Sequence, residues 1–144
     1  MNNEISIKNI VDFSNNLIKE TNLVFYWYEA KLHDLLITEI MSSPVPSIGL
    51  PGKEYIEIYN NCPYPLTLNN WEICINQNCK KLKTTLNSKS YLIVCDAVDT
   101  AYFTSYEAIA GISGLNSLPN DGAVVELKNQ NHETIHYIDY SDKM

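Results

Sequence analysis

The most recognisable chemical motif of the chain is a His-Glu-x-x-His spacing near its C-terminus, formed by His132, Glu133 and His136. On an α-helix, two histidines four residues apart share one face and hold the zinc ion of a metalloprotease. Here the motif runs into alternating aromatic and β-branched residues, which favour a strand. On a strand these positions lie about 13 Å apart, too far for two nitrogens that each need about 2.1 Å to one zinc. We therefore interpret the motif as a hairpin strand that begins after an exposed turn at His132, and we expect neither a metal site nor catalysis from it.

Four cysteines offer a second possible chemistry. Cys74 and Cys79 flank four residues in a segment typical of a hairpin, which would place them opposite each other. A cross-strand Cα separation of about 4.5–5.5 Å suits a disulfide. Free thiols are the alternative, and a zinc site would need two close cysteine pairs, which Cys62 and Cys95 do not form. Cys95 ends an apolar run and is expected to be a small buried apolar residue.

Three glutamates, Glu39, Glu54 and Glu57, lie in or beside two expected strands. Paired carboxylates serve acid–base chemistry or calcium binding. The alternative is structural, with the carboxylates accepting hydrogen bonds from the backbone or from tyrosine hydroxyls. The sequence contains no EF-hand spacing, glycine-rich phosphate loop or nucleophile elbow, so no cofactor is expected.

The charge balance and the length of the apolar runs argue against two classes of partner. Ten cationic residues, all of them lysines, stand against 17 acidic ones, and the net charge is −7. A nucleic-acid binder needs a basic face and commonly uses arginine on phosphates and bases. No uncharged apolar run approaches the roughly 20 residues of a membrane span. We expect neither nucleic acid as a partner nor insertion into a membrane.

Short β-branched and aromatic runs, separated by Asn, Pro and Gly, predict an all-β chain. Strands are expected at 5–10, 23–28, 35–41, 55–59, 71–75, 79–86, 91–95, 123–127 and 134–140. The period-two pattern predicts a core built on Ile56, Ile58, Trp71, Ile73, Leu92, Val94, Val125 and Leu127. A turn is expected within 12–20, and Asp99 is expected to cap a short helix over 101–109.

Three segments, in chain order, carry a resemblance to a known family. The first is Leu36-Ile37-Thr38-Glu39-Ile40-Met41-Ser42-Ser43-Pro44-Val45-Pro46, followed by Gly49-Leu50-Pro51-Gly52-Lys53-Glu54-Tyr55-Ile56-Glu57-Ile58-Tyr59-Asn60. The others are Leu68-Asn69-Asn70-Trp71-Glu72-Ile73 and Ser117-Leu118-Pro119-Asn120-Asp121-Gly122-Ala123-Val124-Val125-Glu126-Leu127. Together they resemble the lamin-tail domain in its bacterial form, over about residues 35–142. Thr38 stands where the family usually has Asn, and 129–132 replace its usual Asp-Gly turn.

The resemblance implies an immunoglobulin-like antiparallel β-sandwich with no known catalysis. It favours the structural alternative for the glutamates and assigns structural roles to the motif residues Glu39, Glu54, Tyr55, Glu57, Asn60, Trp71, Asn120 and Gly122. The family also occurs in secreted bacterial proteins, which implies an extracellular or cell-surface location.

Residues 1–34 fall outside this resemblance and are treated as a separate unit from 35–144. They resemble the last two strands of a bacterial Ig-like domain, which implies a segment of a longer secreted chain. The consecutive aromatics Tyr26, Trp27 and Tyr28 would occupy both faces of a strand and are expected to form a contact patch. An isolated hairpin is only marginally stable, so residues 1–33 are expected to pack on the sandwich or to form a homodimer.

Two functions follow as hypotheses. In the first, the chain is a non-catalytic interaction or structural module of a secreted or cell-surface bacterial protein, and its partner is another domain of the same chain or another protein. In the second, it is an accessory substrate-binding domain of a larger secreted enzyme, such as a nuclease or glycan hydrolase. Neither hypothesis makes this chain itself an enzyme.

Overall fold

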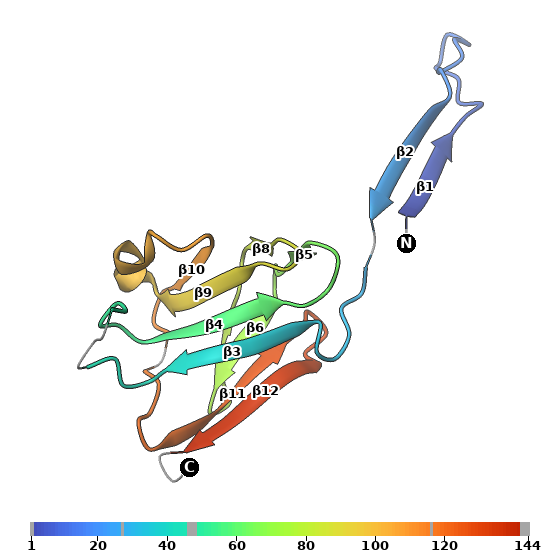
Figure 1. The fold of residues 1–144 in the computed structure, drawn as a ribbon. Helices are drawn as coiled ribbons and strands as arrows, with labels where there is room; N and C mark the ends of the chain where they lie inside the picture. Colours follow the sequence, from blue (N-terminus) through green and yellow to red (C-terminus); the bar gives the residue numbers. More distant parts are fainter. Residues whose placement is uncertain (1, 27, 46–48, 116, 142–144) are drawn as a thin grey trace.

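The computed structural model describes residues 2–26, 28–45, 49–115 and 117–141 and confirms an all-β chain, with 47% of residues in strands and 5% in helix. Two four-stranded sheets face each other, and a separate two-stranded hairpin extends away from them (Figure 1). Among the described residues, no helix is long and apolar enough to cross a bilayer.

The first sheet has the strand order β10-β9-β4-β3. Its members are β3 (Leu35–Met41), β4 (Tyr55–Asn60), β9 (Tyr91–Asp96) and β10 (Ile109–Ile112). The pairs β3–β4 and β4–β9 are antiparallel, as expected, but β9 and β10 pair in parallel. A 3-10 helix, η1 (Ala97–Phe103), lies between β9 and β10 and returns the chain so that β10 enters the sheet in the same direction as β9.

The second sheet has the order β12-β11-β6-β7 and is antiparallel throughout. Its members are β6 (Glu72–Ile75), β7 (Asn78–Lys81), β11 (Gly122–Lys128) and β12 (Thr134–Ser141). A two-stranded ribbon of β5 (Leu66–Thr67) and β8 (Thr85–Leu86) lies at one end of the sandwich. The expected strand 79–86 is therefore divided between β7 and β8, which belong to different sheets.

The eight residues predicted to form the core are all buried. Seven of them are alternate residues of β4, β6, β9 and β11, and Trp71 lies just before β6. Their side chains interdigitate between the two sheets. A smaller apolar cluster lies on the other side of β9, where Tyr55, Ile93, Cys95 and Phe103 pack together under η1. Cys95 is fully buried there, as its position at the end of an apolar run predicted.

The cap of the short helix differs from the prediction. Asp96, not Asp99, caps it by accepting a hydrogen bond from the Val98 N–H at 3.0 Å, and the helix ends at Phe103. Asp99 lies in the first turn, where its carboxylate contacts Lys53 Nζ at 2.8 Å. An acidic residue at the cap and one in the first turn both favour a helix start. The contacts distinguish the two residues here, because Asp96 bonds to the helix backbone and Asp99 to Lys53.

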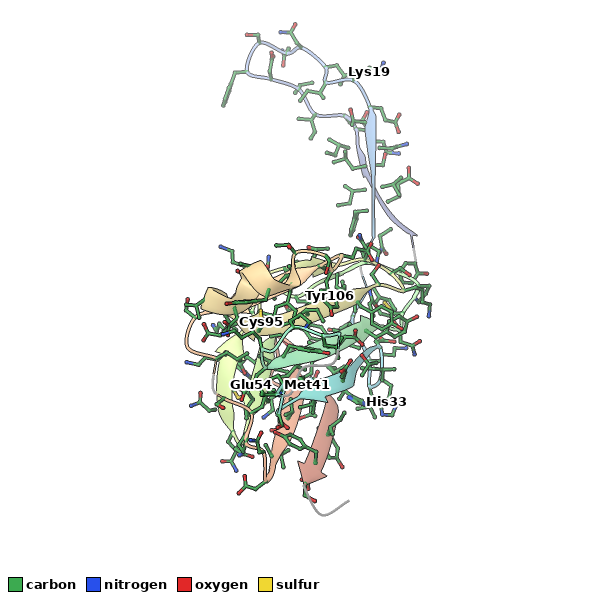
Figure 2. The ribbon with its side chains drawn as sticks, turned by 60° about the vertical axis from the view of Figure 1, so that its left-hand side comes forward. Lys19, His33, Met41, Glu54, Cys95 and Tyr106 are labelled. Atoms are coloured by element: carbon green, nitrogen blue, oxygen red, sulfur yellow. A yellow bond between two sulfur atoms is a disulfide. The ribbon has the colours of Figure 1, made fainter. Side chains whose placement is uncertain are left out.

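The N-terminal hairpin pairs β1 (Asn2–Ile7) with β2 (Thr21–Tyr26). Both strands begin and end a few residues earlier than predicted. The expected turn within 12–20 is confirmed, because Asp12 accepts hydrogen bonds from the Ser14 and Asn16 N–H groups. In Figure 2, Lys19 marks the far end of this hairpin, well away from Cys95 in the sandwich.

Candidate functional site

The two histidines of the His-Glu-x-x-His motif lie on strand and turn, not on a helix. His132 is in the β11–β12 turn, with a φ of 63° and a side chain that is 70% exposed, and its Nδ1 lies 3.0 Å from a carboxylate oxygen of Glu72. His136 is half-buried in β12, and its Nδ1 accepts the Ile37 N–H at 3.1 Å. The two imidazoles therefore face partners in opposite sheets.

His136 joins the sheets at a specific irregularity. The register of β3 against β4 shifts between Ile37 and Glu39, which makes Thr38 the extra residue of a β-bulge. A bulge interrupts the ladder, and the Ile37 N–H is bonded to the imidazole of His136. Burial, with the nearby His33 ring, lowers the pKa of His136. His136 is thus a packing residue in this structure, unlike the exposed His132.

A disulfide joins Cys74 and Cys79, which are paired across β6 and β7 with Cα atoms 3.9 Å apart. The turn between these strands has two residues, Asn76 and Gln77, both with positive φ, the conformation that suits a tight hairpin. Among the described residues, the one group close enough to share a metal ion is Glu72 with these two cysteines, and its sulfurs are already bonded to each other.

The glutamates of β3 and β4 accept hydrogen bonds from neighbouring hydroxyls. Glu39 accepts the Tyr55 hydroxyl at 2.8 Å, and Glu57 accepts the Thr38 hydroxyl at 2.7 Å. Burial, together with the bond to Glu39, raises the pKa of Tyr55, so the phenol keeps its proton and remains a donor. These carboxylates hold the bulged edge of the first sheet together.

Glu54 ties the start of β4 to the chain that leads into β11. Its carboxylate accepts the Ser117 hydroxyl at 3.0 Å and the Leu118 N–H at 2.9 Å. Leu118 is buried, so this contact anchors the loop over the core. In the described part of the chain, the three motif glutamates thus serve as hydrogen-bond acceptors for neighbouring protein groups.

Asn60 organises the end of β4 from a fully buried position. Its side-chain amide nitrogen donates to the carbonyl oxygens of Tyr64, Leu86 and Asn87 at 2.9–3.1 Å, and its amide oxygen accepts the Cys62 N–H at 3.0 Å. One side chain therefore satisfies backbone groups of two loops that would otherwise be buried without partners.

Asn120 lies in the turn before β11, and Gly122 is the first residue of that strand. Gly122 has a φ of +131°, and a Cβ built there would lie 2.6 Å from the Tyr140 carbonyl oxygen, so only glycine fits without a shift of the backbone. Asn120 is exposed at this turn. The structure therefore gives a steric reason for the glycine at 122, while the expected role of Asn120 stays a prediction.

The expected aromatic patch is only partly described. Trp27 and the side chain of Tyr26 lie outside the described residues. Tyr28 is half-buried and packs against Tyr64, with ring centroids 5.2 Å apart. Its hydroxyl donates to Asp34 at 2.8 Å, and this bond, aided by burial, raises the pKa of Tyr28 to about 12. Tyr28 therefore belongs to the surface of the sandwich and holds a fixed position there.

Tyr28 and Tyr64 border a cleft of about 430 Å³ at one end of the sandwich, a volume within the usual range of small-molecule sites, about 300–1,000 Å³. We call it the aromatic cleft. It is lined by segments from four parts of the chain: Phe25 and 28–30, 64–67, Trp71, and the β11–β12 turn at 129–131.

Sequence reasoning identified Trp71 as a core residue and did not connect it with Tyr64 or with the turn at 129–131. Neither Tyr64 nor the turn carries a local pattern that links it to Trp71. Segments this far apart in sequence converge only through the packing of the two sheets.

The comparisons with known proteins add no assignment: the chain matches no protein-family model, and no curated protein matches it significantly. Functional conclusions therefore rest on the geometry described above.

Proposed function

We propose that this chain is a non-catalytic, Ig-like interaction module of a secreted or cell-surface bacterial protein, and that the β1–β2 hairpin is its interaction element. The observation that carries the proposal is the uncovered apolar face of this hairpin. The Cys74–Cys79 disulfide supports the location, because disulfides persist mainly in oxidising compartments outside the cytosol.

The register of the hairpin separates its two faces. Residues directly opposite each other share a face, so Ile5 with Leu23 and Phe25 with Asn3 lie on one side, together with Ile7. Ile5, Leu23 and Phe25 are 50%, 52% and 42% exposed. The other face carries the polar residues Glu4, Ser6 and Asn22 together with Val24. The hairpin is amphipathic, yet its apolar face remains open to solvent.

Such a hairpin gains stability from a partner. A two-stranded sheet is marginal in water, and three or more strands with a hydrophobic face are needed for independent stability. In the described part of the chain, β1 and β2 pair only with each other, so each leaves one edge open. Open edges recruit further strands, and β-strand addition is a common mode of protein recognition.

A second copy of the chain is the partner that β1 fits. If two β1 strands pair in antiparallel fashion about Ser6 and the pairing extends one residue beyond β1, Glu4 of each copy lies opposite Lys8 of the other, and Ile5 lies opposite Ile7. The two-fold symmetry gives two opposite-charge pairs and two aliphatic pairs, each worth about 0.2–1 kcal/mol. The resulting four-stranded sheet places the apolar residues of both hairpins on one face.

The roles of the carboxylates support a non-catalytic module. Glu39, Glu54 and Glu57 are each bonded to neighbouring hydroxyl or N–H groups of the sandwich. The resemblance to the lamin-tail family, whose motif contains these positions, agrees with a structural role. The aromatic cleft favours a second candidate function, an accessory substrate-binding domain of a larger enzyme.

The test of the hairpin is a charge-reversal cycle on the whole chain, read as mass by sedimentation equilibrium over a wide range of protein concentration. We expect the wild type to dimerise. Glu4→Lys should weaken the dimer by placing two lysines opposite each other, and Glu4→Lys combined with Lys8→Glu should restore it. Glu107→Lys is the matched control, since it makes the same charge change at an exposed position of the sandwich, away from the hairpin, and should leave the dimer unaffected.

A monomeric wild type at every concentration would overturn the dimer, as would a double variant no stronger than Glu4→Lys alone. Measurable hydrolysis of peptide, glycan or nucleic acid by the purified chain, abolished by Glu39→Gln, would overturn the non-catalytic proposal itself.

A further inference from the structure

The aromatic cleft contains a nearly buried hydrogen-bond donor that the protein does not use. Trp71 is 6% exposed and lines the cleft. No described residue accepts a hydrogen bond from its indole N–H, although buried tryptophan N–H groups usually have a partner. No described side-chain polar atom is both sealed from solvent and unpaired, so this N–H reaches solvent, and Trp71 is one of the residues that line the cleft.

Two tyrosine rings form an apolar wall beside this donor. Tyr28 and Tyr64 are inclined at 45° to each other, and the bond from Tyr28 to Asp34 keeps the first ring in place. Cys62 donates to the Tyr64 carbonyl, and Asn60 donates to the same oxygen, so the second tyrosine is also held at its backbone. The wall is formed before any ligand arrives, which reduces the entropic cost of binding.

Another part of the lining is polar and is also held in place by hydrogen bonds. Gln130 and Asn131 are exposed on the β11–β12 turn and line the cleft. The buried Asn129 holds this turn, because its amide oxygen accepts the N–H groups of Asn131 and Glu133 and its amide nitrogen donates to the Glu133 carboxylate. Two side-chain amides thus offer both donors and acceptors to the cleft.

The charge of the lining narrows the ligand class. Among the described residues that line the cleft, none is Lys, Arg or His, and the one ionised side chain is Glu29. A phosphate, sulfate or carboxylate would find no cation there and would be repelled by Glu29. The lining therefore disfavours an anionic ligand, and it offers aromatic faces together with groups that both donate and accept hydrogen bonds.

We propose that the aromatic cleft binds a neutral carbohydrate. A pyranose ring has faces of C–H bonds that stack on aromatic rings, and its hydroxyls both donate and accept, which suits the Trp71 indole, the two amides and Glu29 together. A proline-rich peptide would also dock on aromatic rings. It lacks N–H groups at its prolines, however, and would leave the amide and carboxylate acceptors of the rim unused.

The test titrates the full chain with neutral oligosaccharides and follows the indole N–H signals by NMR, with calorimetry for affinity. The probes are hexaoses of glucose in α- and β-linkage, mannose, galactose and N-acetylglucosamine. Trp27→Phe assigns the Trp71 signal by difference. We expect at least one hexaose to bind with a dissociation constant below about 1 mM and to shift the Trp71 signal.

Two variants locate the site. Tyr64→Ala should weaken binding roughly tenfold through loss of the stacking surface, and Trp71→Phe about fivefold, since it keeps an aromatic ring but removes the N–H donor. Tyr137→Ala is the matched control, because Tyr137 is 63% exposed on β12 and does not line the cleft. Its affinity should equal that of the wild type.

Three outcomes would overturn the proposal: no hexaose binds at millimolar concentration, a hexaose binds equally well to Tyr64→Ala, or a proline-rich decapeptide shifts the Trp71 signal while the hexaoses do not. The Glu4→Lys variant separates this proposal from the hairpin proposal. It should bind the same hexaose with unchanged affinity, whatever its oligomeric state.

Discussion

The sandwich and the N-terminal hairpin are built from similar strands, yet they differ in what covers them. Leu92 on β9 and Leu23 on β2 both sit in runs of apolar residues, but Leu92 is fully buried and Leu23 is 52% exposed. In the sandwich, each sheet supplies the layer that buries the other. The hairpin has an apolar face and no second layer (Figure 1). Strand formation and burial are therefore separate properties. Within the described chain, the hairpin forms strands but its apolar side chains are not buried.

The largest expected effect comes from the same substitution in the two regions. Leu92→Ala should lower the free energy of unfolding by about 2–5 kcal/mol, because it removes buried methyl groups and leaves a cavity. Leu23→Ala should change it by no more than about 0.5 kcal/mol, as for an ordinary surface position. Urea denaturation followed by tryptophan fluorescence measures both. Equal losses would mean that the hairpin folds as part of the same core.

Removal of a side-chain amide should also lower the free energy of unfolding much more in the sandwich than in the hairpin. Asn60→Ala leaves several buried backbone carbonyls without a donor and should cost about 2–3 kcal/mol in the same assay. Asn22→Ala, on the exposed polar face of β2, provides the comparison and should have almost no effect. A small loss of stability in Asn60→Ala would show that water replaces the lost donor, and hence that the loops at the end of β4 admit solvent.

The disulfide should have an intermediate effect confined to the sandwich. Cys74 and Cys79 are separated by five positions, and the entropy of closing so short a loop in the unfolded chain predicts a loss of about 2 kcal/mol for the double alanine variant. A reductant should destabilise the wild type by a similar amount and leave the variant unchanged. Amide exchange in β1 and β2 should be identical in both proteins; faster exchange there would indicate coupling between the regions.

The smallest expected effect is a pH dependence that originates in the sandwich. The folded-state pKa of His136 lies below its ordinary value of about 6.5, because burial disfavours the charged ring. The unfolded chain therefore binds a proton first as pH falls, so this contribution to stability is present above about pH 6.5 and is lost as pH falls through the folded pKa.

His136→Gln should flatten the difference between urea midpoints at pH 7 and pH 5, since an amide oxygen can still accept the Ile37 N–H but does not titrate in this range. Asn22→Ala, which changes no titratable group and lies at an exposed position, is the control and should keep the wild-type slope. Residues 2–26 contain no histidine, so the hairpin should not contribute to the difference. An unchanged slope in His136→Gln would assign the pH dependence to other groups.

Much of the local structure could be predicted because it depends on neighbouring residues. The alternation at 55–60 predicted β4 and the inward orientation of Ile56 and Ile58. The strand-like context of His136 excluded a helix despite the motif. The hairpin at Cys74 and Cys79 was expected, although its turn is shorter than the spacing suggested, because Asn76 and Gln77 both adopt positive φ.

The candidate site was less predictable, since its parts are far apart in the chain. Trp71 was correctly expected to be buried, but burial alone does not reveal that it also lines a cleft. Tyr64 and Asn131 carry no local pattern that links them. The choice between Asp96 and Asp99 as helix cap was also undetermined, because both are acidic residues near the start of the helix.

The sequence by itself predicted most of the strands, although not β10, and which of their faces are apolar; its excess of acidic residues is the reason that we expect no nucleic-acid partner. Each of these depends on residue type and on a period of two. Only the tertiary structure decided the parallel pairing of β9 with β10, the bond from Ile37 to His136 between the sheets, and the meeting of Tyr28, Tyr64, Trp71 and the β11–β12 turn around one cleft. These features require two sheets to be stacked in one relative position, and that position is selected by the packing of many side chains at once.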